Sequence, residues 1–129
     1  MLEHLIQLRR AWEGEFPEGG SLIRRRVDLP TQWPTGLDAP FRLTRAFQRP
    51  PIDPGRERLA LRLGSVPGLR SIRLNEWEIA RVAEGISGLT IDLPDLLPPR
   101  NRLVLDVDPS DWGEPPGLWG EVALVIRSD

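Results

Sequence analysis

The stretch Arg58–Val107 reads RLALRLGSVPGLRSIRLNEWEIARVAEGISGLTIDLPDLLPPRNRLVLDV, and its apolar residues recur at every second position in several short runs. The clearest run, residues 58–63, places three leucines on one side of an extended chain and two arginines on the other. Similar runs occupy residues 71–74 and 102–107. Turn-forming residues separate the runs at 66–68, 84–85 and 98–101. This spacing predicts an all-β sandwich or barrel.

Further strands are predicted on both sides of this stretch. Leu5–Trp12 could be a short helix or a first strand, and we favour a strand because residues 13–17 break it after too few residues for a stable helix. The other predicted strands are Leu22–Leu29, Phe41–Phe47 and Glu121–Arg127. The strand Phe41–Phe47 would turn one arginine, Arg45, toward the interior. The total is about eight or nine strands, which usually close as a two-sheet sandwich.

The composition limits the kinds of site that the chain can build. The sequence has 129 residues, no cysteine and one histidine, so residues 1–129 suit one domain without disulfides or a Cys/His zinc site. Its 17 basic residues are all arginines and are outnumbered by 19 acidic residues, which disfavours nucleic-acid binding. The first 16 residues contain no uninterrupted apolar run, so we expect neither an export signal nor a membrane span, and a cytoplasmic protein. No pattern indicates a cofactor.

The order of several short motifs resembles a known family. These motifs are Val27–Trp33, Phe41–Phe47, Leu61–Gly68, Ile72–Asn75, Asn101–Val107 and Gly117–Leu124. They are similar to motifs of the amino-terminal sugar-binding domain of glycoside hydrolase family 2, the β-galactosidase and β-glucuronidase family, and the resemblance covers roughly residues 5 to 127. The resemblance implies a jelly-roll β-sandwich of the galactose-binding type.

The sequence departs from the family pattern at two positions. The family usually has Asn-Gly after its I-x-L/V strand, whereas this chain has Asn75-Glu76, so we expect a longer or differently shaped hairpin there. The family also tends to place arginine after the aromatic residue of its G-I/L-aromatic motif, where this chain has Gly120. Any role of that arginine beside a neighbouring active site would be lost.

The resemblance also bears on catalysis. Family members carry their catalytic carboxylates on a separate barrel domain, which typically needs about 250 residues. A chain of 129 residues cannot contain that barrel. The resemblance therefore implies a non-catalytic accessory module that binds carbohydrate and has no hydrolase activity. No G-x-S-x-G motif or phosphate-binding P-loop is present. The alternative function is a protein-interaction or assembly module, with a protein partner or a second copy of the chain on the same surface.

The candidate ligand-binding residues come from the tryptophans and their neighbours. Trp12 and Trp33 are predicted to be core or loop-anchoring residues, because large aromatic rings are rarely left in water. Asp111 and Trp112 lie in the loop PSDWGEPPG, where the family can contribute an acidic side chain to the sugar site. The complete candidate set is Asn75, Glu76, Trp77, Asp111, Trp112 and Trp119. Trp119 stands at the entrance of the last strand, where core packing is the competing interpretation.

Overall fold

The computed structural model describes residues 2–82 and 88–128, which fold into ten strands and one short 3-10 helix. The strands are β1 (Leu2–Gln7), β2 (Trp12–Glu18), β3 (Ser21–Val27), β4 (Phe41–Gln48), β5 (Glu57–Leu63), β6 (Leu69–Leu74), β7 (Trp77–Arg81), β8 (Leu89–Asp92), β9 (Arg100–Val107) and β10 (Val122–Ser128). The helix, η1, is Pro109–Asp111. No helix among these residues is long and apolar enough to cross a membrane.

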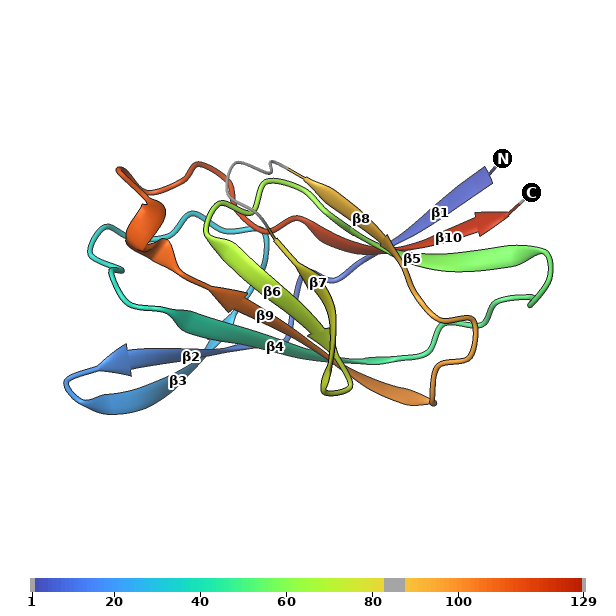
Figure 1. Ribbon diagram of the computed structural model, residues 1–129, viewed down its shortest axis with the longest axis horizontal. Helices are drawn as coiled ribbons and strands as arrows, with labels where there is room; N and C mark the ends of the chain where they lie inside the picture. The colour runs from blue at the N-terminus through green and yellow to red at the C-terminus, as the bar shows by residue number, and fades with distance from the viewer. Residues whose placement is uncertain (1, 83–87, 129) are drawn as a thin grey trace.

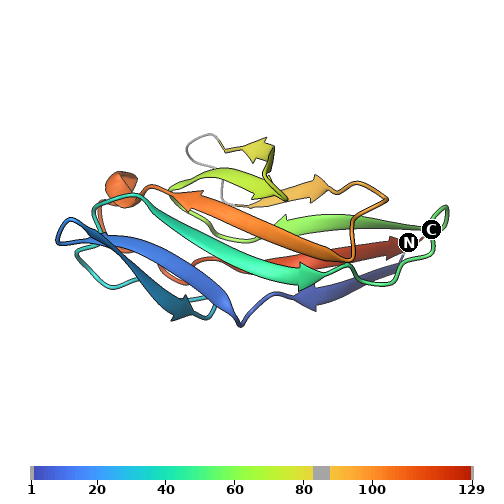
Figure 2. The same cartoon turned by 90° about the horizontal axis from the view of Figure 1, so that it is seen from below.

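The strands form two antiparallel sheets that pack face to face, which confirms the predicted sandwich (Figures 1 and 2). One sheet has four strands in the order β1-β10-β5-β8, and the other has six in the order β3-β2-β4-β9-β6-β7. Strands that are neighbours in a sheet are often far apart in the sequence. The fold is therefore held by long-range pairing.

The two-residue alternation decides which side chains fill the space between the sheets. Leu59, Leu61 and Leu63 of β5 are all at most 2% exposed, as the sequence predicts. The matching residues of β9 are equally buried, namely Leu103, Leu105 and Val107. β10, which lies between β1 and β5, is buried on both faces from Val122 to Ile126, and its outward residues in this range, Ala123 and Val125, are small. The core is thus leucine-rich and continuous.

The choice of a strand over a helix for Leu5–Trp12 was correct, but the predicted bounds were wrong. These residues do not form one strand, because the chain leaves the four-stranded sheet after Gln7 and enters the six-stranded sheet at Trp12. The crossing includes Ala11, which has a positive φ of 66°. The supposed break at residues 13–17 belongs to β2. Its proline, Pro17, lies beyond the residues of β2 that pair with β4, so its missing N–H leaves no gap in that ladder.

The hairpin after β6 is not longer than two residues, so that alternative of the prediction was wrong, although the ladder beside it has a register shift between Ile72 and Arg73. Leu74 faces Trp77 in register, so the turn contains only Asn75 and Glu76. Both have positive φ, 53° and 74°, as a type I′ turn requires. Asparagine tolerates this conformation, whereas glutamate normally avoids it. The turn predicted at residues 84–85 lies outside the described residues.

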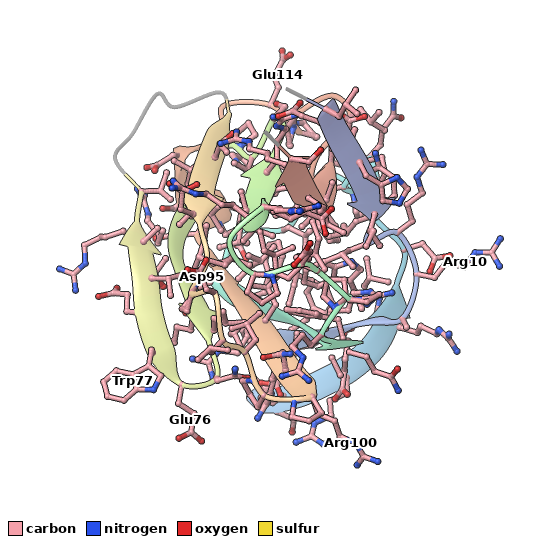
Figure 3. All side chains as sticks on the ribbon, turned by 90° about the vertical axis from the view of Figure 1, so that its right-hand side faces the viewer. Arg10, Glu76, Trp77, Asp95, Arg100 and Glu114 are labelled. Carbon is pink, nitrogen blue, oxygen red and sulfur yellow. The ribbon has the colours of Figure 1, made fainter. Side chains whose placement is uncertain are left out.

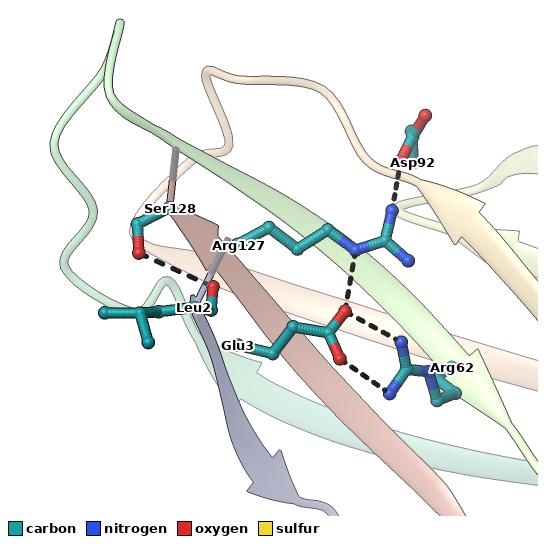
Figure 4. A network of polar contacts seen from close by, with 6 residues as sticks. All are labelled: Leu2, Glu3, Arg62, Asp92, Arg127 and Ser128. Atoms are coloured by element: carbon teal, nitrogen blue, oxygen red, sulfur yellow. Dashed lines mark hydrogen bonds and ion pairs between the residues drawn. The ribbon is translucent and has the colours of Figure 1, made fainter.

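An ion-pair network ties the strands of the four-stranded sheet together on its outer surface (Figure 4). Glu3 of β1 accepts hydrogen bonds from Arg62 of β5 at 3.0 Å and from Arg127 of β10 at 3.1 Å. Arg127 also lies 3.8 Å from Asp92 of β8. The hydrogen bond from Arg62, followed by that from Arg127 and the charges of both arginines, holds the pKa of Glu3 below its usual value despite the opposing effect of burial. The network therefore joins all four strands.

Candidate functional site

The loop that connects β9 to β10 is held in place at its start by η1. Asp108 precedes this helix, and its side chain accepts a hydrogen bond from the backbone N–H of Ser110 at 3.0 Å. That bond is the main reason why the pKa of Asp108 lies below its ordinary value. At the other end, the N–H of Trp112 donates to the carbonyl of Pro109 at 2.9 Å. Asp111 is therefore presented from a short, ordered turn.

Two tryptophans fix the rest of this loop to the sandwich through one acceptor. The indole N–H groups of Trp112 and Trp119 both donate to the carbonyl oxygen of Pro67, at 2.9 and 2.8 Å. Trp112 is half-buried and meets Phe41 edge to face, with ring centroids 6.4 Å apart. Trp119 is fully buried against Trp33, so its ring offers no surface to a ligand. Core packing is the correct interpretation of Trp119.

The close approach of this loop to the start of β6 requires glycine at position 68. Gly68 has a φ of 80°, and a Cβ there would lie 2.5 Å from the carbonyl oxygen of Asp108 and 2.9 Å from the indole nitrogen of Trp112. The carbonyl of Gly68 also accepts a hydrogen bond from the N–H of Asp108 at 2.8 Å. Only glycine combines that backbone conformation with that contact. The sequence motif Val66-Pro67-Gly68 is thus part of the loop's support.

Asp111 lies at the surface beside a charged groove. Its side chain is 39% exposed and forms an ion pair and hydrogen bond with Arg70 of β6. Arg70 also lines a groove of about 480 Å³, together with Phe41, Arg42, Asp106 and Asp108. These side chains come from β4, β6 and β9 and from the residue before η1.

Asp106, which lines this groove, is held in place by polar side chains of β4 and β6. It accepts hydrogen bonds from Arg42 and from the hydroxyl of Ser71, each at 2.9 Å, and lies 3.3 Å from Arg73. Sequence reasoning did not select the arginines of this groove. The sequence did contain a signal for them. Arg42 and Arg70 both lie on the outward face of a strand, and Arg42 is directly opposite Asp106 in the neighbouring strand.

The other candidate residues belong to the β6–β7 hairpin. Asn75 serves the fold, because its side chain donates to Asn101 at 2.8 Å and accepts from the N–H of Arg102 at 2.9 Å. Trp77 is 77% exposed and projects from the body of the protein beside Glu76 (Figure 3). Large aromatic rings are rarely left in water to this extent, so Trp77 is a candidate contact residue in its own right.

The two groups of candidate residues lie at opposite ends of β6. The loop with Asp111 contacts residues just before Leu69, and the turn Asn75-Glu76 follows Leu74. Six strand residues span roughly 20 Å. The groups therefore form two separate surfaces rather than one. Within residues 2–82 and 88–128, no three histidine or acidic side chains lie close enough together to hold a metal ion.

Comparisons with solved structures find the same fold in parts of several glycosidases. No protein-family model and no curated protein matches the sequence. An FMN-binding β-glucuronidase from Faecalibacterium prausnitzii L2-6 matches 98% of the chain with a TM-score of 0.77 and 21% identity. A family 2 β-galacturonidase from Eisenbergiella tayi, bound to galacturonate, matches 97% with a TM-score of 0.70 and 12% identity. The fold is that of a family 2 glycosidase domain.

This family 2 glycosidase fold accounts for only part of each similar protein. The chain covers 23% of the length of the first and 24% of the second. A β-glucuronidase from Ruminococcus gnavus, in complex with D-glucaro-1,5-lactone, matches 98% of the chain over 29% of its own length, with a TM-score of 0.68 and 15% identity. The chain thus spans about a quarter of the length of the structures that it resembles.

Proposed function

We propose that this chain is a non-catalytic domain that contacts carbohydrate through the loop carrying Asp111 and Trp112. The observation that carries the proposal is the position of Asp111. It is a surface carboxylate, held by Arg70 at the edge of a charged groove, on a loop that is fixed at both ends. A pre-positioned carboxylate can accept hydrogen bonds from neighbouring sugar hydroxyls without first losing side-chain freedom.

The fold and its similar structures support this assignment of ligand class. The similar proteins are named as a β-glucuronidase and a β-galacturonidase, and one of them is bound to galacturonate. In the family that the sequence resembles, the loop before the final strand approaches the sugar site. Asp111 stands in the comparable loop of this chain, directly before the half-buried Trp112. Binding by one carboxylate at an open groove should be weak.

The test is isothermal calorimetry of the chain with a panel of methyl glycosides and free uronic acids. At least one sugar should bind, and Asp111→Asn should weaken it about tenfold, because a charged hydrogen bond contributes about 1.5–3 kcal/mol. Asp95→Asn is the matched control, since Asp95 is an exposed aspartate of the loop between β8 and β9, outside this groove. The absence of binding to any sugar, or equal binding by the Asp111→Asn variant, would contradict the proposal.

A second candidate function rests on Trp77. An aromatic ring that is 77% exposed at a hairpin tip is typical of the anchor residues of protein interfaces. In this alternative, the hairpin docks onto another protein or a second copy of the chain. Sedimentation velocity at several concentrations tests the self-association case. Assembly through the hairpin would be favoured if the wild type forms a dimer, Trp77→Ser makes it monomeric, and Asp111→Asn leaves the dimer intact.

A further inference from the structure

One arginine of the six-stranded sheet occupies a position that normally holds an apolar residue. Arg45 belongs to the inward-facing set of β4, with Phe41, Leu43 and Phe47. Its Nε–H donates to the carbonyl of Arg10 at 2.7 Å, and its Nη1 donates to the carbonyl of Ala46 at 2.9 Å. Arg45 thus fastens the chain segment that crosses from β1 to β2.

These contacts leave the positive charge of Arg45 without a balancing carboxylate. Within residues 2–82 and 88–128, the guanidinium forms no ion pair, and the two carbonyls use only part of its five N–H donors. Burial lowers the pKa of Arg45, although an arginine remains charged at neutral pH. Arg45 is only partly buried, so water still hydrates part of its charge, and an anion bound beside it would compensate the part that the protein covers.

Arg45 lines a cavity of about 520 Å³ between the edge strand β1 and the inner face of β4. The apolar part of its wall comes from Ile6, Leu8, Ala46, Phe47 and Leu124. The polar part comes from Arg45, Arg100, Gln7, Gln48 and Asn101, and it contains no acidic residue. Gln48 and Arg100 are partners in register at one end of the β4–β9 pair, and Arg100 projects into solvent there (Figure 3).

We propose that this cavity binds a small organic anion, in which a carboxylate or phosphate group is joined to an apolar body. The anion would accept hydrogen bonds from the remaining N–H groups of Arg45, and its charge would be attracted by Arg100 at the rim. The apolar body would lie against the accessible apolar part of the wall, which Ile6 and Ala46 provide over the buried side chains of Leu8, Phe47 and Leu124. A volume of about 520 Å³ is larger than an inorganic ion needs and falls in the range of small-molecule sites.

This site is independent of the proposed sugar contact. Phe41, which lines the groove beside Asp111, begins β4, whereas Gln48, which lines the present cavity, ends it. The eight residues of that strand separate the two by roughly 23 Å. Failure of either proposal therefore leaves the other intact.

The test uses two-dimensional NMR of the ¹⁵N-labelled chain at constant ionic strength. Phenyl phosphate and benzoate are titrated in separate experiments, with inorganic phosphate and benzyl alcohol as probes of the charge alone and the apolar body alone. We expect saturable shifts of the Arg45 Nε–H and of the backbone amides of Gln7, Gln48 and Asn101. At least one of the two aromatic anions should bind at least tenfold more tightly than either partial probe.

Two variants separate anion binding from the structural role of Arg45. Arg45→Gln should weaken binding of the aromatic anion at least tenfold, but it also removes the hydrogen bond to the Arg10 carbonyl. Gln48→Glu leaves that bond in place and adds a carboxylate at the rim, so it should weaken binding without disturbing the fold. Arg24→Gln removes an equal charge from an exposed arginine of β3 and should have no effect.

Three results would overturn the proposal. One is the absence of saturable shifts at these residues for both aromatic anions. Another is equal binding of benzyl alcohol and phenyl phosphate, which would show that the charge of Arg45 is not recognised. The third is unchanged binding by both Arg45→Gln and Gln48→Glu, which would place the anion elsewhere on this arginine-rich chain.

Discussion

Replacing Glu76 with glycine should increase the stability of the sandwich, because Glu76 holds a backbone conformation that suits glycine. Glu76 is the second residue of the two-residue turn and has a φ of 74°. Its side chain is exposed and takes part in no hydrogen bond or ion pair with the described residues. The substitution therefore relieves the backbone without removing a contact.

The magnitude follows from two opposing terms. A left-handed conformation costs an ordinary L-residue about 1–2 kcal/mol. Glycine avoids this cost but loses more chain entropy on folding, which offsets about 0.5–1 kcal/mol of the gain. The net stabilisation should be about 0.5–1 kcal/mol, and it would convert the turn into the Asn-Gly pair favoured for this hairpin type.

Equilibrium unfolding in urea measures this difference. The midpoint should rise for Glu76→Gly while the slope m stays constant, which identifies a change in stability rather than in the surface exposed. Glu76→Ala is the matched control, because alanine removes the carboxylate but keeps the Cβ. It should leave the midpoint nearly unchanged. If the glycine variant is less stable than the wild type, or no more stable than the alanine variant, then the turn does not hold Glu76 under strain.

Three further outcomes are expected. Leu61→Ala and Leu105→Ala, each replacing a side chain that is 0% exposed, should each lower the free energy of unfolding by about 2–5 kcal/mol in urea titrations; small losses at both would contradict their placement between the sheets. Gly68→Ala should lower the melting temperature far more than Gly113→Ala, because its Cβ would lie 2.5 Å from a backbone oxygen, whereas Gly113 has open space around it; equal effects in calorimetry would argue against the tight contact. The lowered pKa of Glu3 should stabilise the folded state above the carboxyl's unfolded pKa of about 4.3, and this contribution should disappear as the pH falls through the lower folded value. Glu3→Gln should therefore have a lower free energy of unfolding than the wild type at neutral pH, and the difference should shrink in acid. If the difference between the two proteins does not change with pH, the role assigned to the network is contradicted.

The alternation of apolar residues was enough to predict the central strands. In β4, β5 and β9 the residues that fill the core recur at every second position, whereas β10 is buried at every position from Val122 to Ile126. The prediction failed where the chain crosses between sheets. Leu5–Trp12 has the same periodicity on both sides of the crossing, so the sequence shows one strand where the structure has two.

The turn at Asn75-Glu76 shows a different limit. Glutamate at a positive φ is unfavourable locally, so local preference predicts another hairpin shape. The tertiary structure overrides this preference, because the Asn75 side chain and N–H bind Asn101 and Arg102 of the neighbouring strand β9. Such pairing joins residues about 26 positions apart, which no local pattern reveals.

The candidate site was predictable only in part. The choice of the Asp111 loop came from its proline- and glycine-rich, acidic sequence and from the family resemblance, and the structure adds Arg70 as the partner that orients the carboxylate. The groove below it depends on which outward residues of β4, β6 and β9 become neighbours. The cavity around Arg45 was likewise not predictable from the sequence, because its walls come from β1, β4, β9 and β10, which become neighbours only in the folded chain.

The five tryptophans differ in their exposure to solvent, and this difference determines which of them will dominate changes in the protein's fluorescence. Trp12 and Trp119 are 0% exposed and Trp33 is 7% exposed, so water-soluble quenchers such as iodide should reach mainly Trp77. A change in fluorescence on adding a sugar would then report mainly on Trp77 in the hairpin and less on Trp112 in the loop with Asp111. A Trp77→Phe background would silence that signal and leave the half-buried Trp112 as the residue most responsive to events at the groove.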